Sequence, residues 1–180
     1  MRLRKLKNKI LIFVSLTCAL AILCFALARV IFTNKHYSNI KSICNGTQIS
    51  PSLVLAIIKT ESSFDKDKIS HKGAIGLMQI MPETANYVSQ LYFSGEKFDL
   101  TNEKQNVLIG VTYLIYLNNK FEDKKTALAA YNAGEGRVYE WLENKDYSLD
   151  GKTLNSIPFK ETENYVKKVI QREKFYNLLY

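Results

Sequence analysis

The sequence has few of the side chains that form disulfides or bind metal ions. Its 180 residues contain three cysteines and two histidines. Cys18 and Cys24 lie in an apolar N-terminal stretch, so Cys44 stands alone in the rest of the chain and cannot form an internal disulfide there. Because His36 and His71 are the only histidines, we expect no zinc site.

The sequence also lacks a block of basic residues outside its N-terminus. The net charge is +8, but residues 1–32 hold six basic and no acidic side chains. The other 148 residues carry a net charge of only +2, spread along the chain. Because nucleic acids are bound through clustered Lys and Arg side chains, this distribution does not favour nucleic-acid binding.

One long apolar run stands near the N-terminus. Residues 10–32 contain a single charged side chain, Arg29, and they exceed the roughly 20 residues that cross a bilayer core as a helix. Residues 1–9 include five basic side chains, which favour a cytoplasmic position for this flank. We therefore expect a basic cytoplasmic tail (1–9), an uncleaved single-pass transmembrane signal-anchor (10–32) and a remainder that lies outside the cytoplasm.

Two other interpretations of the N-terminus stay open. A cleaved signal peptide also begins with a basic segment, but its apolar core is typically about 7–15 residues long and ends near a small-x-small cleavage site, which is not evident here. A lipoprotein is disfavoured, because neither Cys18 nor Cys24 follows the small residue that a lipid-attachment cysteine usually needs.

The rest of the chain shows no sustained alternation of apolar and polar residues, no repeats and no low-complexity tract. Residues 33–50 are polar and mixed, and we expect a stalk that holds at most a short helix around residues 37–43. From residue 51 the apolar spacing is helical. We expect one predominantly α-helical domain over residues 51–180 with its own core, with a loop at 70–80 and helices at 51–64, 82–92, 103–121, 124–133, 137–143 and 161–180.

Glu61 is the first residue whose position conflicts with its chemistry. Val54, Ile57 and Ile58 mark the buried stripe of a helix, and Glu61 takes the next position of that stripe. Burial favours the neutral form of a carboxyl group and raises its pKa, so such a group can donate a proton to the leaving oxygen of a glycosidic bond. A glutamate near a helix end that reaches solvent or pairs with a lysine is the simpler explanation of the periodicity alone.

A glycine-containing segment, residues 73–83 (GAIGLMQIMPE), forms a second candidate. Gln79 places an amide in an otherwise apolar run, where it can bind hydroxyl and acetamido groups or satisfy the backbone of a loop. Met78 and Met81 fit core positions at least as well as substrate contacts.

Two later segments also place polar groups at helix ends. Residues 127–137 (ALAAYNAGEGR) set Tyr131 and Asn132 just before a glycine, where the tyrosine hydroxyl can bond a carboxylate or only hold the turn. Residues 157–169 (IPFKETENYVKKV) set Glu161 at the start of the last helix, where capping explains a carboxylate.

Together and in this order, these segments resemble the soluble lytic transglycosylase family of lysozyme-like glycosidases. The resemblance rests on ES at residues 61–62, GLMQIMP at 76–82, AYNAG at 130–134 and PFKETENYV at 158–166. The ordered set is far more specific than any one segment, and it favours the catalytic interpretation of the glutamate in ES. It implies a helical domain of the goose-type lysozyme/transglycosylase kind with a glycan groove.

The resemblance also implies roles for the residues that match it. Glu61 matches the single catalytic acid/base of the family. The supporting or substrate-binding positions begin with Ser62, which follows the glutamate in the motif, and Ser70, which helps to position an acetamido group. Gln79 and Met81 match positions that line the groove. Tyr131 and Asn132 match a pair beside the glutamate, which the tyrosine hydroxyl orients, and Glu161 matches a second family glutamate.

The implied reaction is the cleavage of peptidoglycan glycan strands without water. Glu61 protonates the oxygen between N-acetylmuramic acid and N-acetylglucosamine, and then takes the proton of the C6 hydroxyl that closes a 1,6-anhydro ring. Ordinary glycosidases use two carboxylates, whereas the nearest other acids here, Asp65 and Asp67, lie in a polar turn. The family needs no metal or organic cofactor, and the implied partners are peptidoglycan and, through residues 10–32, the bacterial cell membrane.

Two alternatives stay open. A muramidase of the goose-type lysozyme kind has the same scaffold but uses water in place of the C6 hydroxyl, and the GLMQIMP and AYNAG segments disfavour it. An inactive peptidoglycan-binding scaffold has no need of a carboxyl group on a buried stripe.

Overall fold

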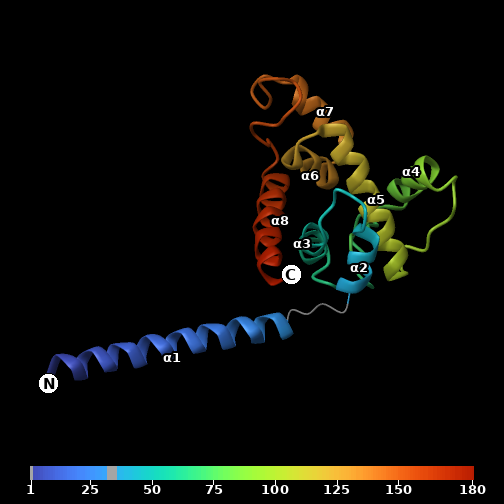
Figure 1. Ribbon diagram of the computed structural model, residues 1–180. Helices are drawn as coiled ribbons and strands as arrows, with labels where there is room; N and C mark the ends of the chain where they lie inside the picture. The colour runs from blue at the N-terminus through green and yellow to red at the C-terminus, as the bar shows by residue number, and fades with distance from the viewer. Residues whose placement is uncertain (1, 32–35) are drawn as a thin grey trace. The chain divides into compact units, whose positions relative to one another are not determined.

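The computed structural model describes residues 2–31 and 36–180, which are mostly helical (Figure 1). In this part of the chain β-type pairing is confined to isolated bridges, Ile69 with Ile75 and Ile75 with Ile80. The predicted predominantly α-helical fold is confirmed. The helices form two compact units that divide between His36 and Tyr37. They are α1 (Arg2–Ile31), α2 (Tyr37–Cys44), α3 (Pro51–Glu61), α4 (Pro82–Tyr92), α5 (Glu103–Phe121), α6 (Lys124–Ala133), α7 (Glu135–Glu143) and α8 (Lys160–Leu179).

The first unit contains α1, which is apolar over most of its length. It is the one helix of the described residues that is long and apolar enough to cross a membrane, with its candidate span at Lys7–Cys24. An N-terminal signal sequence fits the same criterion. At 1.5 Å per residue α1 is about 45 Å long, more than the hydrocarbon core of about 30 Å. Residue 1 of the predicted tail and residue 32 of the predicted anchor lie outside the described residues.

From Tyr37 onward, the segment predicted as a stalk (residues 33–50) belongs to the compact domain, and the short helix expected around residues 37–43 is present in it. This segment forms α2, which packs on α3 and α5. Ile40 and Cys44 are buried, because residues four apart on a helix share one face and can both point into the core. A short helix was expected here, but the few apolar residues in a polar stretch gave no sign that it packs into the core, and the compact domain begins at Tyr37. Residues 33–35 lie outside the described residues.

Helix α3 is surrounded by the rest of the second unit, with α2 and α8 beside it in Figure 1. The Ser50 hydroxyl oxygen accepts the backbone N–H of Leu53 at 3.1 Å, and Pro51 occupies the first turn, where no N–H is needed. Every side chain from Ser52 to Ile58 is buried, so the first two turns are core on all sides. The helix ends at Glu61, three residues before the predicted end.

Asn106 of α5 fixes the loop between α3 and α4. Its Oδ1 accepts the backbone N–H of Met78 at 2.9 Å. Its Nδ2 donates to the carbonyl oxygens of Ile75, at 2.8 Å, and Leu100, at 3.0 Å. Because Asn106 is buried, these bonds replace hydrogen bonds to water. Gly76 packs directly on this amide, and a Cβ there would come within 2.4 Å of Nδ2.

Helix α5 contacts both α4 and α6, and α6 contacts α7. The side chains of Asn102 and Asp123 cap α5 and α6 by accepting backbone N–H groups. Gly134, with φ of +90°, ends α6 and is followed directly by α7, which begins two residues before the predicted start. The bounds of α4, α5 and α6 agree with those predicted from the sequence.

Helix α8 closes the domain over α3 and is bonded to both of its ends. Arg172 donates to the Thr60 hydroxyl oxygen at 2.7 Å, next to the end of α3. The buried Glu173 carboxylate accepts from Lys124 at 2.8 Å and from the Ser50 hydroxyl at 3.4 Å, at the start of α3. The helix that ends in a candidate catalytic residue is therefore held from one side by α8.

Gly76→Ala is expected to destabilise the domain far more than Gly73→Ala. Both glycines have positive φ, +78° and +89°, so alanine costs about 1–2 kcal/mol at either position. Only at Gly76 does the new Cβ also meet Asn106 and the Leu100 carbonyl oxygen, which adds about 1–3 kcal/mol of strain. The measurement is urea unfolding of the full chain in detergent, followed by the fluorescence of Trp141. Equal losses for the two variants would contradict the contact with Asn106.

Candidate active site

Glu61 is the last residue of α3 and lies where that helix reaches a cleft. Val54, Ile57 and Ile58, the predicted buried stripe, are fully buried. The other faces of α3 are buried as well, so the stripe is not a distinct face of this helix. Glu61 itself is part-buried. Its carboxyl group therefore emerges from the core instead of from a solvated helix surface.

Burial raises the pKa of Glu61 to about 7. The hydroxyl of Tyr165 and the ammonium group of Lys68 favour the carboxylate and lower this pKa, but by less than burial raises it. Lys68 Nζ donates to the backbone carbonyl oxygen of Glu61, which keeps its charge next to this residue. A carboxyl group with a pKa near 7 can both give and take a proton at neutral pH.

Tyr165 is a site residue that the sequence did not identify. It is buried on α8, and its hydroxyl makes no hydrogen bond of ordinary geometry with the described residues. It is nevertheless close enough to Glu61 to affect the pKa of that residue, and burial and the Glu61 charge raise the pKa of Tyr165 well above its usual value. In the sequence, Tyr165 stands on the same helix face as the apolar Val166 and Val169, as Glu61 stands on the face of Ile57 and Ile58. A polar group on an apolar helix face is thus the signal that could have identified it.

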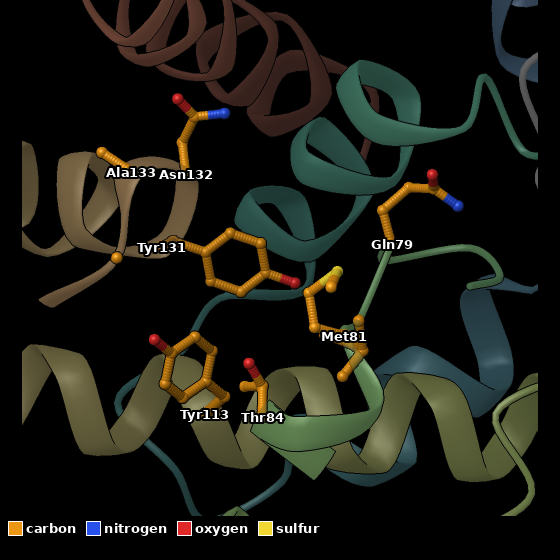
Figure 2. A pocket seen from close by; sticks show the side chains of 9 residues that line it. Gln79, Met81, Thr84, Tyr113, Tyr131, Asn132 and Ala133 are labelled. Carbon is orange, nitrogen blue, oxygen red and sulfur yellow. The ribbon is translucent and has the colours of Figure 1, made fainter. Parts of the chain in front are cut away.

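Tyr131 lies beside Glu61, but its hydroxyl bonds elsewhere. The ring points from α6 across the cleft towards Met81 (Figure 2), and the hydroxyl donates to the Met78 carbonyl oxygen at 2.9 Å. Burial first and the Glu61 charge second raise the pKa of Tyr131 well above its usual value, so the two groups are close. The Tyr131 hydroxyl therefore uses its proton on the loop backbone, and its expected role in orienting the glutamate stays a prediction. The Tyr165 hydroxyl is the one that lowers the pKa of Glu61.

Gln79 uses one end of its amide for the loop and presents the other to the cleft. Its Nε2 donates to the carbonyl oxygens of Lys68, at 3.0 Å, and Gly76, at 2.8 Å. Its Oε1 accepts no hydrogen bond within the described residues, and Gln79 lines the cleft with Glu61. Its φ of +49° is uncommon outside glycine. The amide therefore satisfies the loop backbone and still offers an acceptor.

Asn132 and Ser70 add hydrogen-bond donors to the same cleft. Asn132 Oδ1 accepts the Thr162 hydroxyl at 2.8 Å, which joins α6 to α8, and its Nδ2 makes no bond within the described residues. Ser70 Oγ accepts the backbone N–H of Ala74 at 3.0 Å and retains its own proton to donate. Both side chains are thus positioned by one bond and able to form another.

Most of the predicted site residues meet in one cleft. It is lined by Glu61, Ser70, His71, Lys72, Ala74, Gln79, Met81, Tyr131, Asn132 and Glu161. Gln79, Met81, Tyr131 and Asn132 also line a neighbouring hollow that extends past Tyr113 and Thr84 (Figure 2). The two hollows share these four residues and are parts of one groove. His71 and Lys72 are members of this lining that the sequence did not indicate.

Ser62 is the predicted site residue that the structure places outside the groove. It is buried, donates to the Ile58 carbonyl oxygen at 3.1 Å and accepts the backbone N–H of Phe64 at 3.2 Å. It therefore closes the turn after α3. Glu161, in the first turn of α8, is exposed at the groove, where the helix dipole favours a carboxylate.

Glu61 is the one part-buried carboxyl group of this lining. Glu161 is exposed, and Asp65 and Asp67 are exposed in the turn after α3, outside the lining. Asp67 accepts from Lys66 at 2.7 Å. In the described residues there is no group of three or more His, Cys, Asp or Glu side chains placed to hold a metal ion. The chemistry that these side chains offer is proton transfer by a single carboxyl group.

The chain is similar to proteins of a known family. Residues 38–154 match the family described as transglycosylase SLT domain. The soluble lytic murein transglycosylase of Salmonella typhimurium is 39% identical over 137 residues, which cover 73% of this chain and 21% of the relative. The membrane-bound lytic murein transglycosylase C of Histophilus somni is 32% identical over 156 residues, which cover 73% of this chain and 43% of the relative. The chain thus spans less than half the length of both proteins.

A solved structure shares the fold. The 70-kDa soluble lytic transglycosylase from Escherichia coli matches 78% of this chain and 24% of its own chain, with a TM-score of 0.67 and 34% identity. The helical fold that the four sequence segments implied is confirmed by this similarity.

Glu61→Gln is expected to raise the free energy of unfolding at pH 8 and to leave it nearly unchanged at pH 4.5. The pKa of Glu61 is about 7 in the folded chain against an ordinary value of 4.5. Between these values the folded chain binds more protons, so the stability due to this group falls as the pH rises through 7. An uncharged amide avoids that loss, a gain of about 1–3 kcal/mol at pH 8. Urea unfolding followed by Trp141 fluorescence measures it; the same change at both pH values would contradict a raised pKa.

Proposed function

Because this chain belongs to the transglycosylase SLT domain family, we propose that it cleaves peptidoglycan glycan strands and leaves 1,6-anhydromuramyl ends. The observation that carries the proposal is the Glu61 carboxyl group in the groove, whose pKa is raised to about 7 by burial. Near neutral pH such a group is protonated often enough to act as an acid, and its carboxylate is basic enough to take a proton back.

In the first step Glu61 acts as the acid. It donates its proton to the oxygen that joins C1 of N-acetylmuramic acid to N-acetylglucosamine. The C1–O bond breaks, its electron pair stays with the oxygen, and that oxygen becomes a hydroxyl group of the departing sugar. Positive charge develops at C1, where the carbonyl oxygen of the muramyl acetamido group stabilises it. The Ser70 hydroxyl, which has a proton to donate, holds this acetamido group.

In the second step Glu61 acts as the base. Its carboxylate takes the proton of the C6 hydroxyl, and the C6 oxygen forms a bond to C1 that closes the anhydro ring. Glu61 is protonated again, and all the atoms of the substrate are found in the two products. Between the steps the carboxylate is favoured by the Tyr165 hydroxyl and the Lys68 ammonium group, both of which lower the pKa of Glu61.

The distribution of acids supports transfer to an internal hydroxyl over hydrolysis. Glycosidases that use water place a second carboxyl group across the bond as nucleophile or base. Here Glu161 is exposed in the groove, and Asp65 and Asp67 lie outside its lining. The C6 hydroxyl of the substrate, by contrast, needs only the one carboxyl group that Glu61 supplies.

The remaining groove residues suit a glycan strand. Tyr131 and Met81 offer apolar surface to sugar rings, while Gln79 offers an acceptor and Asn132 a donor to hydroxyl and acetamido groups. Glu161, on the exposed first turn of α8, can accept hydrogen bonds from sugar hydroxyls.

The groove is further proposed to act outside the cytoplasm on peptidoglycan near the bacterial membrane. Helix α1 is a candidate membrane span, and a relative that this chain resembles is named a membrane-bound transglycosylase. Five basic residues at positions 1–9 favour a cytoplasmic N-terminus. Residues 10–32 then form a single-pass anchor, and the domain lies on the side where peptidoglycan is found.

Purified peptidoglycan incubated with the full chain in detergent is expected to gain anhydromuramyl ends, detected by mass spectrometry. Glu61→Gln should lower the initial rate by about 10²–10⁴-fold, the usual contribution of general acid–base catalysis. Glu161→Gln is the matched control, since it changes an exposed carboxyl group of the same groove. Its rate should fall at most about tenfold, the effect of one lost hydrogen bond.

The same digestion in ¹⁸O-labelled water separates the alternatives. Reducing muramyl ends that carry ¹⁸O would identify a muramidase and overturn transfer to the C6 hydroxyl. Retained binding to peptidoglycan without any cleavage by the wild-type chain would identify a binding scaffold. Equal rates for Glu61→Gln and the wild type would remove Glu61 from the mechanism.

Tyr165→Phe is expected to shift the alkaline limb of the pH–rate profile upwards. The limb reports loss of the Glu61 proton, and the Tyr165 hydroxyl lowers the pKa of Glu61. Removing this hydroxyl should therefore raise the midpoint of the limb. Tyr131→Phe is the control, because that hydroxyl bonds to a backbone carbonyl oxygen. A shift in Tyr131→Phe and none in Tyr165→Phe would reverse the assignment of the two tyrosines.

A further inference from the structure

The C-terminal end of α8 carries apolar side chains that the groove does not use. Phe175, Leu178 and Tyr180 are 43%, 72% and 36% exposed. The Tyr180 ring stacks on the ring of Tyr37, the first residue of the domain, with centroids 4.0 Å apart. Lys174 is exposed on the same helix, four residues before Leu178. These five residues are called the α8-end patch below.

Chain length keeps this patch close to the membrane. The apolar run ends at Phe32, and Tyr37 follows after five peptide links. Five links span at most about 18 Å even when they are fully extended. With residues 10–32 in the bilayer, as proposed above, Tyr37 cannot lie farther than this from the end of the apolar run. The rest of the patch adjoins Tyr37 through the stacked ring of Tyr180.

The side chains of the patch are those found at membrane–water interfaces. Tyrosine rings place an apolar body and a polar hydroxyl at the level of the lipid headgroups. Phe175 and Leu178 supply the apolar surface that enters the boundary with the acyl chains. A lysine beside them can lie along this surface while its ammonium group stays in water.

The charge at this end of α8 also favours lipid as the partner. Residues 168–180 contain three basic side chains, Lys168, Arg172 and Lys174. Their one acidic side chain, Glu173, is buried and paired with Lys124 at 2.8 Å. The exposed charge is therefore basic, which attracts anionic phospholipids. A second copy of the same surface, placed against it in a symmetric dimer, would bring like charges together.

We infer that the α8-end patch inserts into the lipid headgroup layer and so sets the orientation of the domain relative to the membrane. This inference rests on the anchoring included in the proposed function. Tyr165 precedes Tyr180 by 15 residues of α8, which corresponds to about 22 Å along a helix. A patch held in the headgroups thus keeps Glu61, next to Tyr165, at a fixed height for attack on glycan strands.

The test places a fluorescent label on the patch in the full chain. Leu178→Cys, with Cys18 and Cys24 replaced by alanine, is labelled with nitrobenzoxadiazole and reconstituted in phosphatidylglycerol–phosphatidylethanolamine liposomes. The matched control is Leu149→Cys, since Leu149 is also 72% exposed. It lies in the loop between α7 and α8, at the opposite end of α8 from the C-terminus (Figure 1). Lipids with a nitroxide near the headgroup are expected to quench the label at position 178 at least about twofold more strongly than the label at position 149.

Three results would overturn the inference. Equally weak quenching of both labels, in a chain that resists carbonate extraction, would place the patch in water and leave the proposed function intact. Weak lipid quenching with self-quenching between Leu178 labels would show that a second copy covers the patch. A chain released by carbonate would refute the anchor and the inference together. Glycan cleavage by the same labelled samples tests the proposed activity separately.

Discussion

The free-energy cost of ionising the Glu61 carboxyl group away from water is the constraint on which the other features of this domain depend. Helix α3 is buried on all sides through Ile58, so its last residue passes directly from the core into the groove. Helix α8 closes over α3 and brings Tyr165 to the carboxyl group, while the following loop brings Lys68 to the backbone of Glu61. Burial raises the pKa of Glu61 by more than Tyr165 and Lys68 lower it, and the resulting value of about 7 suits proton transfer in both directions.

The polar residues around Glu61 are held in place by the bonds that they make within the domain. Gln79, Ser70 and Asn132 each engage one polar atom with a neighbour and keep another for the groove. Asn106 then ties the loop that carries the first two to α5. Groups fixed in this way lose little freedom when a sugar binds, which is how preorganised sites favour a reaction.

Much of this arrangement could be predicted from the sequence, because local chemistry marks it. Asn102 marks the start of α5 because its side chain caps the helix, and Gly134 marks the end of α6 because of its positive φ. The ordered motifs located most of the groove. A short helix near Tyr37–Cys44 was expected only as part of a stalk, and its packing into the domain was missed, since two buried side chains in a polar stretch resemble a linker. Which tyrosine hydroxyl lowers the pKa of Glu61, that of the part-buried Tyr131 or that of the buried Tyr165, could not be predicted, because it depends on how α6 and α8 pack and not on either local sequence.

Direct titration of the Glu61 carboxyl group tests the central claim most directly. Carbon-13 NMR of the full chain in detergent, with glutamate labelled at Cδ, follows this group by itself once its resonance is assigned by its absence from the Glu61→Gln spectrum. A midpoint near 7 is predicted, because burial outweighs Tyr165 and Lys68. A midpoint near the ordinary value of 4.5 would contradict the account, since Glu61 would then be ionised at neutral pH and would have no proton to give.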